Sequence, residues 1–159
     1  MTPGKVFISS GGRLPCRAVA HTVGPIWNGG RSNEEDELEK AVSAALKKAD
    51  SHDSHRTISV PAISCGIYKF PHEKAASVIL NTVRDFLEKG NPSSLTEITV
   101  IDGSEKMIQI FYQVLCKMFG AGRVKQESLM PSAGLFYHIF YLLMHGVLFP
   151  STMKYCLFY

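Results

Sequence analysis

The chain has 159 residues, a formal net charge of +3 and 45% hydrophobic residues, which suits one globular domain and argues against a wholly disordered chain. Its 17 basic residues form no run that marks a nucleic-acid surface, so direct nucleic-acid binding is not expected. The four cysteines form no CxxC pair, which excludes a zinc knuckle and argues against a disulfide scaffold.

Hydrophobic spacing predicts strands that alternate with helices as far as about residue 119. Short β-branched runs bounded by glycine or proline indicate strands, and apolar residues three and four positions apart indicate helices. The expected strands are 5–9, 17–23, 57–63 and 95–101, and the expected helices are 34–49, 71–89 and 105–118. This alternation predicts a mainly parallel sheet covered by helices, with a ligand beyond the carboxyl ends of the strands.

Several polar and aromatic residues have an ordinary structural interpretation. His21 is expected to be a satisfied core residue, Trp27 a core packing residue, and Glu34–Glu39 a solvated helix face. The loop that holds His52 and His55 offers too few ligands for a closed metal site, so a solvated loop and no metal are expected.

The loop from Ser64 to Tyr68 is the strongest candidate for chemistry. It leaves a predicted strand, contains the single glycine Gly66, and leads into a helix that begins near Pro71. Successive backbone N–H groups in such a loop point at one spot and bind anions without lysine or arginine. Cys65 lacks an activating environment, so no nucleophilic role is expected.

Three motifs resemble those of the macro domain, and they occur in the order found in that family. They are Gly4–Cys16, Ala20–Trp27 and Ile58–Pro71. The likeness runs to about Phe119 and is nearest to the macro modules of the macro-domain poly(ADP-ribose) polymerase proteins. It assigns residues 4–122 to a partial macro domain and 123–159 to a hydrophobic tail.

The resemblance implies ADP-ribose binding on a three-layer α/β/α sandwich, with no cofactor, metal or catalytic residue. The expected diphosphate and distal-ribose residues are Ser64, Cys65, Gly66, Ile67 and Tyr68. Ile101 and Asp102 are expected beside the adenine. The aliphatic Ile101 gives up the aromatic stacking found in some members, which is worth about 1–3 kcal/mol per base in nucleic-acid binders.

Relative to the family pattern, this chain begins after the first strands, the Asn-rich strand end and the first glycine-rich phosphate loop. We therefore expect an N-terminally truncated module with weakened ADP-ribose binding. The alternatives are a mono-ADP-ribosyl hydrolase, which draws its catalytic groups largely from the earlier segment, and a non-binding product whose tail associates with membranes.

The composition of the chain changes after Glu127. No Asp, Glu, Lys or Arg occurs from Ser128 to Met153, and eight of the 16 aromatic residues fall between Phe136 and Tyr159. The apolar run Leu135–Phe149 has 15 residues, whereas a bilayer span needs about 20. A replaced chain end is the favoured interpretation, and a segment that covers exposed sheet surface is an alternative.

The resemblance also carries expectations about partners and location. ADP-ribosylated proteins are the expected partners, and the nucleus and cytoplasm are the expected compartments. Residues Met1–Ser10 lack the apolar core of a secretory signal, which agrees with a reduced intracellular compartment. The sequence leaves the oligomeric state open.

Overall fold

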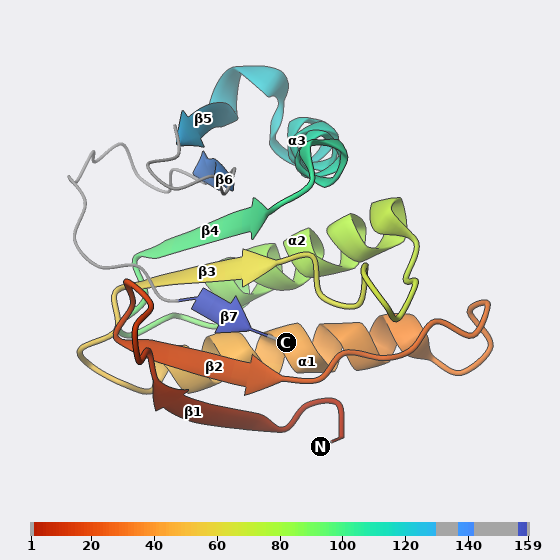
Figure 1. The fold of residues 1–159 in the computed structure, drawn as a ribbon. Coiled ribbons are helices and arrows are strands. Elements are labelled where there is room, and N and C mark those ends of the chain that lie inside the picture. Colours follow the sequence, from red (N-terminus) through yellow and green to blue (C-terminus); the bar gives the residue numbers. More distant parts are fainter. Residues whose placement is uncertain (1, 130–136, 142–155, 159) are drawn as a thin grey trace.

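The computed structural model describes residues 2–129, 137–141 and 156–158 (Figure 1). Its helices are α1 (Glu34–Asp50), α2 (His72–Lys89), α3 (Glu105–Phe119) and the short 3₁₀ turn η1 (Ala121–Arg123). Its strands are β1 (Val6–Ser10), β2 (Ala18–Thr22), β3 (Thr57–Pro61), β4 (Glu97–Asp102), β5 (Lys125–Leu129), β6 (Tyr137–Tyr141) and β7 (Cys156–Phe158). The α/β class and every helix expected before residue 120 are confirmed, with boundaries that differ by at most one residue.

The strands form one mixed sheet in the order β1-β2-β7-β3-β4-β6-β5. The expectation of a mainly parallel sheet was wrong, because β1 pairs antiparallel with β2 and β6 pairs antiparallel with both β4 and β5. The β1–β2 connection is a short loop through Gly11 and Gly12, and a connection of this length permits only antiparallel pairing. The parallel pairs are β2–β7, β7–β3 and β3–β4.

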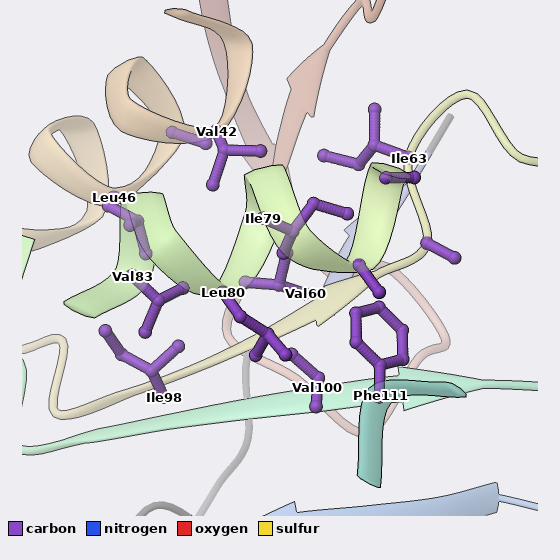
Figure 2. Close-up of a cluster of buried hydrophobic side chains, with 14 of the residues drawn as sticks. Val42, Leu46, Val60, Ile63, Ile79, Leu80, Val83, Ile98, Val100 and Phe111 are labelled. Atoms are coloured by element: carbon purple, nitrogen blue, oxygen red, sulfur yellow. The ribbon is translucent and has the colours of Figure 1, made fainter. Parts of the chain in front are cut away.

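The three helices pack beside one another and share one hydrophobic core with the sheet. Figure 2 shows Val42 of α1 and Ile79 of α2 near Val60 of β3, while Phe111 of α3 lies near Val100 of β4. All five side chains are at least 96% buried. Alternate residues of β3 and β4 therefore face the helices, as expected for strands covered by a helical layer.

Part of the predicted hydrophobic tail contributes strands to this sheet. β5 and β6 extend it beyond β4, and β7 lies between β2 and β3. Within the apolar run, residues 137–141 form β6, and the remainder lies outside the described residues. Among the described residues, no helix has the length and apolar character needed to span a membrane. The boundary at residue 123 stays a prediction.

The Asp50 carboxylate joins the end of α1 to the segment that precedes β4. It accepts hydrogen bonds from the backbone N–H groups of Ser93, Ser94 and Leu95 at 2.8–2.9 Å. Burial raises the pKa of Asp50, but the bonds from Leu95, Ser93 and Ser94 outweigh it and lower this pKa from 3.8 to about 2. The ionised form therefore stabilises the fold.

We expect Asp50→Asn to lower the Tm by several degrees at pH 7, because an amide replaces a charged acceptor shared by three donors. Since the folded pKa lies below the unfolded one, this stabilisation is full above about pH 4 and is lost as the pH falls toward 2. Thermal melts of both proteins from pH 7 to pH 2.5 measure it. A difference in Tm between the two proteins that stays constant from pH 7 to pH 2.5 would contradict this role.

His55 corrects the expectation of a solvated loop. It is only 8% exposed, its Nδ1 lies 3.2 Å from the Ala49 carbonyl, and its ring contacts that of His52. Burial, together with the charge of His52, lowers the pKa of His55, so the buried ring is neutral at pH 7. Among the described residues, no group of three His, Cys, Asp or Glu side chains is placed to hold a metal ion.

Candidate ligand-binding site

Three loops meet at one edge of the sheet, because β2, β3 and β4 share one direction through the parallel pairs β2–β7, β7–β3 and β3–β4. Pro61 at the end of β3 is in register with Ile101 at the end of β4. The loops that follow β2 and β3 are also joined, since the Trp27 N–H donates to the Tyr68 carbonyl at 2.9 Å. The predicted site residues on β3 and β4 thus lie at the same edge.

The loop after β3 is folded by its own backbone hydrogen bonds. Cys65 N–H donates to the Ala62 carbonyl, and Phe70 N–H donates to the Ser64 carbonyl at 2.9 Å. Ser64 has a φ of 66°, a left-handed conformation that turns the chain sharply after the strand. These bonds use the amides on both sides of Gly66 and give the loop a defined shape.

Gly66 and Ile67 lie at the exposed tip of this loop. Their N–H groups donate to no described residue, and a Cβ built on Gly66 meets no atom within 4 Å. Ile67 is 94% exposed. Two successive amides in this exposed stretch are therefore open to an added acceptor, five and six residues before the first residue of α2, whose N-terminal dipole favours an anion.

Ser64 supplies an additional polar atom beneath this tip. Its side chain is 1% exposed, and its Oγ is the one buried side-chain polar atom without a hydrogen-bond partner among the described residues. A buried hydroxyl normally has a partner, so the loop contains an unmet hydrogen-bond requirement. Gly24, in the loop after β2, leaves the room that this hydroxyl occupies, because a Cβ there would come within 2.3 Å of it.

Trp27 packs as expected and also links the two loops. Its ring contacts Phe70 at a centroid distance of 4.8 Å, and the Lys74 ammonium lies 5.7 Å from the Trp27 ring centroid. Lys74 in turn forms an ion pair with Glu35. The first turns of α1 and α2 are therefore held together beside the loop tips.

Glu34 corrects the expectation of a solvated helix face. It is 1% exposed, and its carboxylate accepts the backbone N–H groups of Asn28, Gly30 and Ser32 at 2.8–3.1 Å. Burial raises the pKa of Glu34, but these bonds outweigh it and lower this pKa from 4.5 to about 2. The carboxylate thus fixes the loop after β2. Two glycines before an acidic first-turn residue were the only sequence signal for this anchor.

Cys65 is half-buried in this loop. Burial raises the pKa of its thiol to about 12, and the nearby charge of Asp102 acts in the same direction. A nucleophilic thiol needs the opposite shift, so Cys65 lacks the properties of a catalytic nucleophile. His21 is half-buried instead of a core residue, and its Nε2 lies 2.8 Å from the Ser9 Oγ.

The two predicted adenine-side residues differ in their surroundings. Ile101 and Asp102 are both half-buried at the end of β4. The Asp102 carboxylate accepts the Ser104 N–H at 2.9 Å, and the Ser104 hydroxyl accepts the Met107 N–H at the start of α3. Asp102 is thus held by the helix that follows it, and Ile101 remains the apolar side chain of this pair. Their contact with adenine stays a prediction.

Comparisons with known proteins agree with this arrangement. Residues 1–79 match the family model described as Macro domain. An O-acetyl-ADP-ribose deacetylase from Citrobacter rodentium is 36% identical over 113 residues, which is 71% of this chain and 62% of that protein. A macrodomain from Oceanobacillus iheyensis solved with ADP is 35% identical, with a TM-score of 0.66 over 73% of this chain and 59% of that one.

A variant of the Oceanobacillus iheyensis macrodomain solved with ADPR is 34% identical, with a TM-score of 0.67 over 74% of this chain and 61% of that one. The chain thus spans about three fifths of the length of these relatives. The family-model match includes the loops after β2 and β3.

Proposed function

Because the matched part of this chain is a macro domain in sequence and fold, we propose that the chain binds ADP-ribose through the loop after β3. The observation that carries this proposal is the pair of exposed amides at Gly66 and Ile67, which donate to no described residue. A diphosphate has the charge and the acceptor oxygens to fit them. The α2 N-terminus adds favourable electrostatics.

The ligands of related structures support ADP-ribose as the ligand. ADP and ADPR accompany two macrodomain structures that share the fold at 34–35% identity. In our assignment the diphosphate lies over Ser64–Tyr68, with the Tyr68 ring near the distal ribose. Ile101 covers the adenine. ADP-ribosylated proteins in the nucleus and cytoplasm are the proposed partners, as for the macro modules of poly(ADP-ribose) polymerase proteins.

We propose that this binding is weak, since the chain spans only about three fifths of its relatives and offers few ribose contacts. Calorimetric titration with ADP-ribose should give a dissociation constant well above 1 μM. The binding free energy is then smaller in magnitude than about 8 kcal/mol. Sub-micromolar affinity would contradict the claim that contacts are missing. Heat equal to that of buffer dilution at millimolar ligand would contradict binding altogether.

Hydrolysis is the second candidate, because several similar proteins are named O-acetyl-ADP-ribose deacetylase. Against it, burial raises the pKa of the Cys65 thiol, so this side chain supplies no nucleophile, and the chain spans only about three fifths of these relatives. We expect no release of acetate from O-acetyl-ADP-ribose above the buffer rate. Steady turnover would replace the binding proposal with a hydrolase.

A further inference from the structure

The space between β2 and β3 has the width of one strand, and we call it the β2–β3 slot. These two strands are connected through α1, yet they are not neighbours in the sheet. Residues on both sides of the slot are buried, including Val19 and Ala20 on β2 and Ser59 on β3. The backbone groups that face the slot therefore need a strand as partner, since unpaired buried groups cost about 1–3 kcal/mol each.

The helical layer fits this width. α1 packs against β2, and α1 and α2 pack against each other through residues such as Leu46 and Val83 (Figure 2). Packed helices lie about 8–10 Å apart, which matches two strand spacings of about 4.8 Å. Packing in residues 18–89 is therefore compatible with a slot of this width.

β7 occupies the slot with only three residues. Val19, Ala20 and His21 of β2 are in register with Cys156–Phe158, whereas β3 contributes the single pair Ser59–Cys156. β2 and β3 each have five residues. β7 runs parallel to both, so its carboxyl end at Phe158 points toward the edge that carries the ligand loops, as Figure 1 shows.

We propose that the β2–β3 slot is a strand-acceptor site whose occupant is the chain's own Cys156–Phe158, and that this strand positions the two loops of the ligand site. The second part rests on the proposed function. With β7 in place, β2 and β3 are held in register, and the loops after Thr22 and Pro61 keep the spacing that the Trp27–Tyr68 hydrogen bond requires. Loss of β7 loosens both loops and weakens binding.

Cross-linking of the full chain tests the occupant. Ser59→Cys places a thiol on the residue in register with Cys156, where neighbouring strands put the two Cα atoms about 4.8 Å apart, within disulfide range. Thr99→Cys is the matched control, because Thr99 is in register with Ser59, equally buried, and one strand further from β7. Its Cα is about 9.6 Å from that of Cys156, beyond disulfide range.

After mild oxidation, peptide mapping should find an intramolecular 59–156 disulfide in monomeric Ser59→Cys, at a yield at least about fivefold above any 99–156 product of the control. A disulfide between two chains would overturn the assignment, because the strand would then come from a second copy. Equal yields from both variants would also overturn it. Disulfide formation does not depend on ADP-ribose, so this experiment tests the slot assignment separately from the proposed function.

Leu157→Pro tests the link to the ligand site, with Leu157→Val as control. Proline removes a backbone donor from a strand with neighbours on both sides, whereas valine keeps it. We expect amide exchange in β2 and β3 to rise about tenfold or more and ADP-ribose affinity to fall about tenfold in Leu157→Pro alone. Unchanged exchange would overturn the slot assignment. Raised exchange with unchanged affinity would overturn the positioning role.

Discussion

Gly66→Glu should weaken ADP-ribose binding by about 100-fold or more while leaving the fold intact. A Cβ at Gly66 meets no atom within 4 Å, and the residue has no positive φ, so a side chain is tolerated there. The new carboxylate would face the diphosphate at the loop tip. Like charges 4 Å apart repel by about 4 kcal/mol near a protein surface, which exceeds the roughly 2.8 kcal/mol that a 100-fold change needs.

Gly66→Gln is the matched control, because glutamine has the size of glutamate without its charge. We expect it to weaken binding by less than about tenfold, with a Tm equal to that of Gly66→Glu. Calorimetry at low and high salt separates the effects further, since the repulsion is screened as salt rises. Equal affinity for the glutamate variant and the original chain would remove this loop from the site.

Gly24→Ala should destabilise the protein by about 1–3 kcal/mol, the usual cost of overpacking. Its Cβ would come within 2.3 Å of the Ser64 Oγ and 2.7 Å of the Ile63 Cγ2. Either the loop after β3 or the loop after β2 must shift to relieve this overlap. We therefore expect weaker ADP-ribose binding as well as a lower free energy of unfolding, both measured on the same preparation.

Two further variants identify the cause. Gly103→Ala should have little effect on stability, because its Cβ meets nothing within 4 Å. Ser64→Gly removes the closest clashing atom and suits the positive φ of 66° at this position, so the Gly24→Ala/Ser64→Gly pair should regain part of the lost stability. If the double variant loses as much free energy of unfolding as the two single variants together, the clash lies elsewhere.

The local elements before residue 120 could be predicted because their signals are local. The apolar spacing of Leu38, Val42 and Leu46 predicts α1, and that of Met107, Ile108 and Phe111 predicts α3, whose start is capped by the Ser104 hydroxyl in the structure. Glycine at position 66 gave the candidate loop. Each of these signals depends on a few neighbouring residues, which is the range over which periodicity and capping act.

Most of the errors concern partners that lie far apart in the chain, and Glu34, which is bonded to residues two to six positions earlier, is the exception. Glu34 and Asp50 were not singled out as anchors because their partners are backbone amides, which every sequence has. The strand β7 was not predicted, since its three residues have no pattern of their own and pair with strands from the other end of the chain. Antiparallel pairing of β6 with β4 is likewise a non-local choice that hydrophobic runs leave open.

The most direct measurement of the central claim is an amide-resolved NMR titration of the full chain with ADP-ribose, ADP and adenosine. We predict that the Gly66 and Ile67 amide resonances move most with ADP-ribose and ADP, and stay in place with adenosine, because only the first two carry the diphosphate. Binding that shifts other amides while these two remain still would contradict the assignment, as would an unchanged spectrum at millimolar ADP-ribose.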